Sequence, residues 1–106
     1  MIVVDVYEQE SEVGLSRVAK ALGNPTRVAI IRSLATGGPR ITQDIVRESD
    51  LAQSTVSEHL RILREAELLA CRTDGPRVWY EVRPAVLCQF AGGVEALVED
   101  SLVNGS

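Results

Sequence analysis

The stretch LAQSTVSEHLRILREAELL, residues 51–69, decides the fold of this 106-residue chain. Positions spaced i, i+3, i+4 and i+7 share one face of a helix, and here they hold Val56, His59, Leu60 and Leu63. The opposite face repeats that spacing with Ser54, Ser57, Glu58 and Arg61. We therefore predict one amphipathic helix, closed by a turn, that packs through its first face. The second face has mostly short polar side chains, which allow a close approach to a partner.

Three more helices are predicted before this stretch. The first spans residues 11–22 and carries apolar residues at helical spacing, namely Leu15, Val18, Ala19 and Leu22. Asn24 is a favoured N-cap and Pro25 suits the first helical position, so a second helix begins there. Its expected inner face consists of Val28, Ile31, Leu34 and Ala35. A third helix, over residues 42–49, has Thr42 as its expected N-cap.

The spacing of the apolar residues changes toward the C-terminus. Residues 70–73 and 78–82 favour short strands, and the Asp-Gly-Pro-Arg sequence between them is typical of a hairpin turn. Pro84 begins a last helix, whose apolar stripe consists of Leu87, Phe90, Ala91, Val94, Leu97, Val98 and Leu102. One small domain cannot easily cover so wide a stripe, so a partner helix is expected. Gly92 and Gly93 each cost this helix about 1 kcal/mol relative to Ala, which a close approach across a dimer axis would explain.

The charges are unevenly distributed, which matters because phosphate binding needs a positive surface. The net charge is −4, but residues 13–83 contain eleven Arg or Lys against eight acidic residues. At both ends of the chain, all the charged residues are acidic. All these cations except Lys20 are Arg, whose guanidinium forks onto phosphates and guanine edges. The middle of the chain can therefore face DNA.

The elements together predict a mainly α-helical winged helix-turn-helix with a small β-hairpin wing. The expected order is four helices, two strands and a final helix. Residues 1–12 are expected to form an acidic N-terminal arm, and residues 13–106 a single domain for DNA binding and dimerisation.

Cys71 and Cys88 are too few for a disulfide-dense secreted domain, so the cytosol is the expected compartment. No cysteine or histidine cluster indicates a metal or cofactor, and the N-terminal run, interrupted by Asp5, is neither a signal peptide nor a membrane span. The two cysteines could form a redox switch, or both could be small apolar packing residues. An enzyme with His59 as base is not expected, because neither cysteine lies in a nucleophile motif.

Three segments carry a family resemblance: ALGNPTR at 21–27, LAQSTVSEHLRILREA at 51–66 and RTDGPRVWY at 72–80. In this order they resemble the ArsR/SmtB family of bacterial transcriptional repressors, over about residues 13–90. The resemblance implies a homodimer, joined by its first and last helices, that binds double-stranded DNA. It also implies that the segment from Gln53 to Arg61 enters the major groove, while the wing flanks the minor groove.

The expected DNA contacts come from this helix, the third helix and the wing: Gln53, Ser54, Thr55, Ser57, His59, Arg61, Arg72, Arg77 and Thr42. Gln can fork onto adenine, Ser can bond several base edges, and Arg can take guanine or phosphate, whereas the role of Glu58 stays open. The expected dimer contacts are Leu15, Val18, Leu22, Leu87, Phe90, Val94, Leu97 and Val98. The alternatives are a merely solvated helix face and, at the wing, an ion pair between Arg72 and Asp74.

The chain departs from the family pattern in its metal ligands and in its helix caps. The third helix has no thiol and the last helix no His, so metal sensing by a cysteine box or a His/carboxylate site is not expected. Ala52 stands where the family often has Ser, so an N-cap oxygen is missing. Glu67 stands where the family often has Gly, so a left-handed C-cap would be strained. Each departure costs about 1 kcal/mol.

The sequence thus predicts a dimeric repressor, and not an enzyme, that recognises an inverted-repeat operator with two copies of the same helix. One alternative is a winged-helix module that binds other proteins, which the acidic termini favour. Another is a thiol-responsive repressor that uses Cys71 and Cys88. The sequence names no effector.

Overall fold

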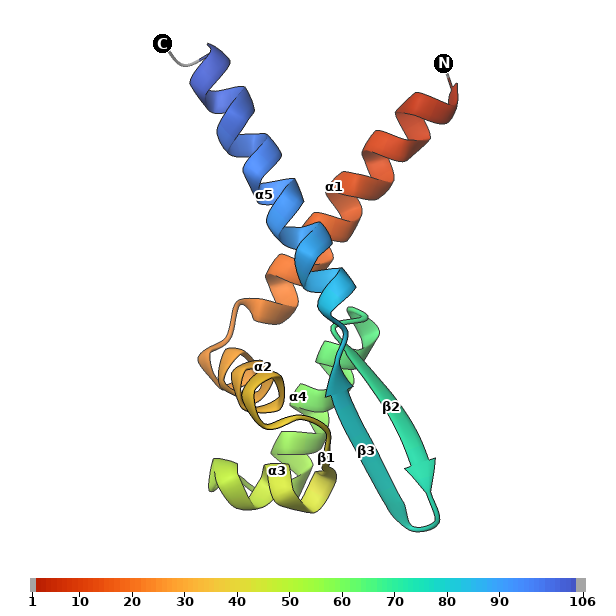
Figure 1. Ribbon diagram of the computed structural model, residues 1–106, viewed down its shortest axis with the longest axis vertical. Coiled ribbons are helices and arrows are strands. Elements are labelled where there is room, and N and C mark those ends of the chain that lie inside the picture. Colours follow the sequence, from red (N-terminus) through yellow and green to blue (C-terminus); the bar gives the residue numbers. More distant parts are fainter. Residues whose placement is uncertain (1, 105–106) are drawn as a thin grey trace.

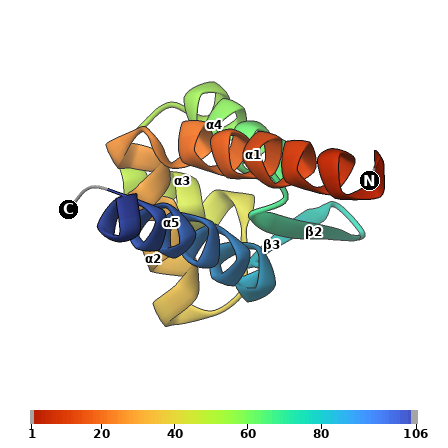
Figure 2. The ribbon, with the colours of Figure 1, turned by 90° about the horizontal axis from the view of Figure 1, so that it is seen from above.

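The structure is a computed structural model that describes residues 2–104, with side chains described from residue 12 onward. The described elements, in order, are α1 (Ile2–Leu22), α2 (Pro25–Gly37), β1 (Arg40–Ile41), α3 (Thr42–Ser49), α4 (Gln53–Glu65), β2 (Leu69–Asp74), β3 (Arg77–Val82) and α5 (Pro84–Asn104). The long helices α1 and α5 cross, and their outer ends diverge from the unit formed by the other elements (Figure 1). Seen from above, the hairpin of β2 and β3 extends to one side (Figure 2).

The predicted winged helix-turn-helix is confirmed, with one strand more than expected. The additional strand, β1, pairs antiparallel with β3, with Arg40 opposite Tyr80 and Ile41 opposite Trp79. The sheet order is therefore β1-β3-β2. The predicted order of elements lacked β1, because two residues are too few to display the alternating pattern of a strand.

Helix α1 begins at Ile2, well before the predicted start at Ser11. The segment expected as an acidic arm, residues 1–12, is thus helical from Ile2 onward and continuous with α1. It contains no Gly or Pro, and the single Gly14 that follows costs a helix only about 1 kcal/mol. Met1 and residues 105–106, which the predicted limits included, lie outside the described residues.

Asn24 caps α2 as predicted. Its side-chain oxygen accepts hydrogen bonds from the backbone N–H groups of Thr26, at 2.9 Å, and Arg27, at 3.3 Å. The buried residues of α2 are Ile30, Ile31 and Leu34. Ala35, predicted to face inward, is exposed, because it lies outside the buried face of this helix, which contacts α1, α4 and β3.

The core is densest around α4. The predicted apolar face is confirmed, since Val56, Leu60 and Leu63 are buried and His59 lies half-buried at its flank. The largest fully buried side chains of the described residues are Leu60, Leu63, Leu68, Leu69 and Val56. Full burial of such a side chain contributes about 1.5–3 kcal/mol. Because Leu69 is the first residue of β2, helix and wing share this core.

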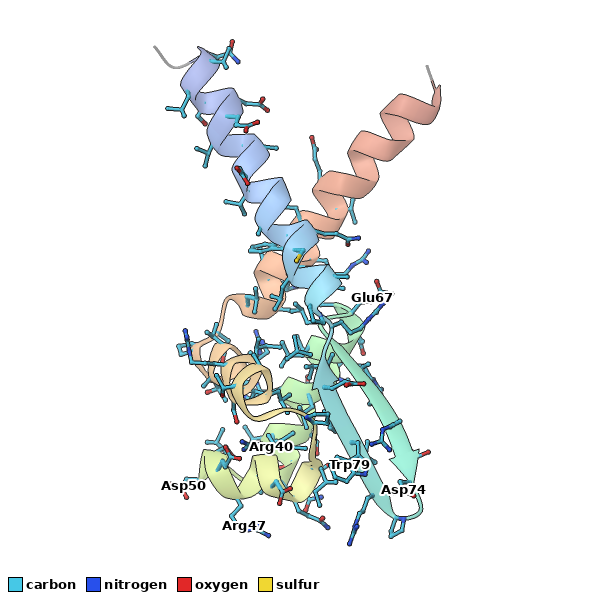
Figure 3. The ribbon with its side chains drawn as sticks, in the orientation of Figure 1. Arg40, Arg47, Asp50, Glu67, Asp74 and Trp79 are labelled. Carbon is cyan, nitrogen blue, oxygen red and sulfur yellow. The ribbon has the colours of Figure 1, made fainter. Side chains whose placement is uncertain are left out.

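Helix α4 ends in a left-handed turn at Glu67, whose φ is 63° (Figure 3). The N–H of Leu68 donates to the Leu63 carbonyl at 3.0 Å, and the N–H of Glu67 donates to the Arg64 carbonyl at 2.9 Å. These two bonds form a Schellman motif, in which the left-handed residue is usually Gly. Leu63 and Leu68 are fully buried, as the hydrophobic contact of this motif requires.

The N-caps of the two helix-turn-helix helices both lack a side-chain acceptor. Ala52 is the N-cap of α4, as expected, and its methyl group cannot bond the free N–H groups of the first turn. For α3 the prediction was wrong, because Ile41 is the N-cap and Thr42 is already helical. The pairing of Ile41 with Trp79 holds Ile41 in the extended conformation that an N-cap needs.

One arginine holds α2, β1 and α3 together. Arg40 forms an ion pair with Glu48 of α3, and Ser33 of α2 donates to Glu48 Oε2 at 3.0 Å. The guanidinium lies directly against Gly37, where a Cβ would collide with it. Figure 3 shows Arg40 in this position between α2 and α3.

Ala52→Ser should raise the free energy of unfolding by about 1 kcal/mol, because the serine oxygen can accept from a free N–H of the first turn of α4. In a domain of this size the thermal midpoint then rises by roughly 4–8 °C. Ala52→Val supplies no oxygen and is the control. An unchanged midpoint for the serine variant, followed by circular dichroism, would contradict the prediction.

Glu67→Gly should also raise the free energy of unfolding by about 1 kcal/mol, because glycine adopts a positive φ without steric cost. Glu67→Ala removes the same carboxylate but keeps the Cβ, so it should leave stability nearly unchanged. Chemical denaturation of both variants measures the difference. Equal stability of the two would show that the side chain, and not the backbone conformation, determines the effect.

Candidate nucleic-acid interface

The polar face of α4 is open to solvent from its first residue. Gln53, Ser54, Thr55 and Ser57 are all exposed. The wing tip and α3 lie toward the same end of the molecule, opposite the outer ends of α1 and α5 (Figure 1). Asp50 and Asp74 mark this end in Figure 3, the first just before α4 and the second at the hairpin turn. Thr42, at the start of α3, is half-buried.

Arg61, expected to contact DNA, is bound to two carboxylates of its own helix. Its Nε and Nη2 donate to Glu58 at 2.9 and 2.6 Å, and its Nη1 donates to Glu65 at 2.5 Å. The hydrogen bond from Arg61 holds the pKa of Glu58 below its ordinary value, and both glutamates raise the pKa of Arg61. Both shifts favour the charged forms of Glu58 and Arg61.

The spacing of these three residues in the sequence is itself a signal of the ion-pair cluster. Glu58 and Glu65 lie three residues before and four residues after Arg61, and such residues are neighbours on a helix surface. Glu58 taken alone has no evident role on a surface that faces DNA. The structure gives it a partner.

His59 is engaged by an arginine from another helix. Arg27 Nη1 lies 3.1 Å from His59 Nδ1, and Arg27 Nε donates to the Ala21 carbonyl at 2.6 Å. Because a guanidinium can only donate, Nδ1 of His59 is the acceptor. Arg27 thereby connects the last turn of α1 and the first turn of α2 to α4. It was not among the predicted site residues, because these contacts join residues far apart in the sequence.

The two wing arginines have different surroundings. The guanidinium carbon of Arg72 lies 5.3 Å from the centroid of the Trp79 ring, a cation–π distance, so Arg72 stacks on the hairpin. Arg77 is exposed at the start of β3, opposite Asp74. In the turn between Asp74 and Arg77, Gly75 has a φ of 59°, as the first central residue of a type II′ turn requires. The wing thus presents Arg77 at its tip and Arg72 along its side.

Both cysteines are free thiols. Cys71 is half-buried in β2 and accepts a hydrogen bond from Arg64 Nη1 at 3.4 Å, whereas Cys88 is exposed on α5. The Cys71 contact raises the pKa of Arg64. The suggested redox role of the pair stays a prediction.

The predicted dimer residues divide into two groups. Val18 is buried in the core of the single chain, Leu15 is half-buried, and Leu22, Leu87 and Phe90 are partly buried side chains packed against the core. Farther along α5, apolar side chains are exposed: Val94, Leu97, Val98, Leu102 and Val103. Val103 was not among the apolar residues predicted for this stripe.

Gly93 explains how closely α1 and α5 cross. A Cβ on Gly93 would lie 3.0 Å from Leu15 Cδ1 of the same chain, whereas Gly92 has open space beside it. Gly93 therefore allows a close approach within one chain, and the expected approach across a dimer axis stays a prediction.

Within the side chains that the structure describes, no three His, Cys, Asp or Glu residues are grouped so that they could hold a metal ion. Among helices in the described part of the chain, none is long and apolar enough to cross a membrane.

Comparisons with known proteins agree with this arrangement. Residues 24–70 match the model of the arsR family of bacterial regulatory proteins. An uncharacterized HTH-type transcriptional regulator of Methanocaldococcus jannaschii is 33% identical over 74% of this chain and 83% of its own. The transcriptional repressor SdpR of Bacillus subtilis is 32% identical over 69% of this chain and 80% of its own.

A solved structure shares the fold. The solution structure of a homodimeric winged helix-turn-helix DNA-binding domain from Mycobacterium bovis, a possible ArsR-family regulator, has 29% sequence identity and a TM-score of 0.66. The match covers 88% of this chain and 84% of that one. These proteins are transcriptional regulators and not enzymes. The chain belongs to the ArsR family and is a transcriptional regulator with a winged helix-turn-helix DNA-binding domain.

Proposed function

We propose that the protein is a dimeric repressor that binds an inverted-repeat operator by inserting the α4 helices of both subunits into successive major grooves. The observation that carries this proposal is the exposed run of polar side chains at the start of α4, at the same end of the molecule as the wing tip. In helix-turn-helix proteins the N-terminal residues of the second helix contact base edges.

The side chains of α4 suit base recognition at short range. Gln53 can form two hydrogen bonds with adenine, and the hydroxyls of Ser54, Thr55 and Ser57 can bond several base edges. His59 is held by Arg27, so in this proposal it orients α4 and contacts DNA only at the flank of the helix. Thr42, Arg72 and Arg77 are the proposed phosphate or minor-groove contacts.

Dimerisation is proposed through α1 and α5. Val94, Leu97 and Val98 on α5 are 41–56% exposed, which is a high exposure for large apolar side chains in one continuous stripe. The homodimeric M. bovis domain gives a precedent in a protein of similar fold. A two-fold dimer would place the two α4 helices about one turn of DNA, roughly 34 Å, apart.

Binding of the purified chain to genomic DNA fragments tests the proposal. The chain should bind DNA at low salt, and its affinity should fall steeply as the salt concentration is raised. The selected fragments should share an inverted repeat. A purified dimer that binds no DNA at low salt would instead favour the protein-binding alternative.

Gln53→Ala and Ser57→Ala should each cost about 1–3 kcal/mol on the selected operator and little on random DNA, because their hydrogen bonds go to bases. Fluorescence anisotropy with two duplexes of equal length measures both affinities. Equal losses on the two duplexes would reassign these side chains to the DNA backbone.

Arg77→Ala should weaken binding to all sequences alike and reduce the salt slope by about one, because a phosphate contact is lost. Arg83→Ala, just beyond the opposite end of β3, is the matched control and should leave the slope unchanged. If Arg77→Ala also preserves the slope, the wing tip does not touch phosphates.

A further inference from the structure

The Glu58–Arg61–Glu65 cluster gives α4 an unexpected charge for a DNA-binding helix. Arg61 meets Glu58 through two nitrogens and Glu65 through the third, so each nitrogen of the guanidinium faces a carboxylate. The cluster carries a net charge of −1, where Arg61 alone would present +1. An exposed ion pair adds little to folding stability, so the main effect of the cluster falls on the charge of this surface.

Phosphates and base edges meet this cluster differently. Three of the five N–H groups of Arg61 bond the carboxylates, so a phosphate that reaches the other two must lie beside Glu58 and Glu65, whose combined negative charge exceeds the positive charge of Arg61. A base pair can instead satisfy both partners, because a cytosine amino group donates to a carboxylate and a guanine edge accepts from Arg. Non-specific binding rests on phosphate contacts, so the cluster opposes it selectively.

We propose that Glu58 and Glu65 are specificity-determining residues, which withhold Arg61 from phosphates and leave base edges as the partners that satisfy the Glu58–Arg61 pair. This inference rests on the proposed function of α4 as the helix that contacts DNA bases. It gives Glu58, which would repel DNA if it were isolated, a role in rejecting the wrong sequences.

The experiment uses the full chain and two duplexes of equal length, one selected by the wild type from a randomised library and one of random sequence. Glu65→Gln should tighten binding to the random duplex by about one order of magnitude at 0.1 M salt and steepen the salt slope by about one for each Arg61 that gains a phosphate. Glu58→Gln should act in the same direction and also weaken binding to the selected duplex. The ratio of the two affinities therefore falls in both variants.

Glu65→Gln both frees Arg61 from a carboxylate and removes a negative charge, and the Arg61→Ala background distinguishes these two effects. In the Arg61→Ala background, Glu65→Gln should leave the salt slope unchanged, because no cation is released. Glu99→Gln makes the same change of net charge on α5, far along that helix from its junction with the wing, and is the matched control. It should alter neither the slope nor the affinity ratio.

Two results would overturn the proposal: an unchanged affinity ratio in Glu65→Gln, or equal steepening of the slope with and without Arg61. Failure of the proposed function gives a different pattern. The wild type would then show no preference between the duplexes, and Gln53→Ala would have no effect on either.

Discussion

The left-handed turn at Glu67, with Leu63 and Leu68 fully buried on either side of it, is the feature on which the rest of the structure depends. It ends α4 and delivers the chain directly to Leu69, the first residue of β2. Helix and wing are therefore joined by a turn whose two backbone hydrogen bonds and apolar contact leave little freedom. The polar face of α4 and the wing tip keep a fixed relation because of this turn, and a surface proposed to contact DNA at two places needs such a relation.

The arginines show why a count of charges does not describe this surface. The middle of the chain has more cations than acids, but several of its arginines are engaged within the protein. Arg40 pairs with Glu48, Arg61 with two glutamates, and Arg72 stacks on Trp79. Part of the arginine in the sequence therefore serves contacts within the protein. What reaches a partner is a smaller set of groups, each with a defined position.

Local chemistry allowed much of the fold to be predicted, whereas contacts between distant residues could not be. The cap at Asn24 and the apolar face of α4 each follow from a few neighbouring residues, whereas the left-handed residue at Glu67 was expected from the family resemblance. The strand β1 was missed because its pairing with β3 depends on residues about forty positions away, and no local pattern announces a two-residue strand. At the candidate site the exposed residues of α4 were predicted, but the partner of His59 was not, because Arg27 meets it only after α2 has packed.

The contacts of Arg27 give three helices a common fixed point. Its guanidinium bonds the last turn of α1 through Ala21 at 2.6 Å and reaches α4 through His59, while its own backbone lies in the first turn of α2. A shift of α1 along its axis must therefore stretch the bond to Ala21 or pull on α4. The position of the helix proposed to join two subunits and the tilt of the helix proposed to contact bases are mechanically linked through one side chain.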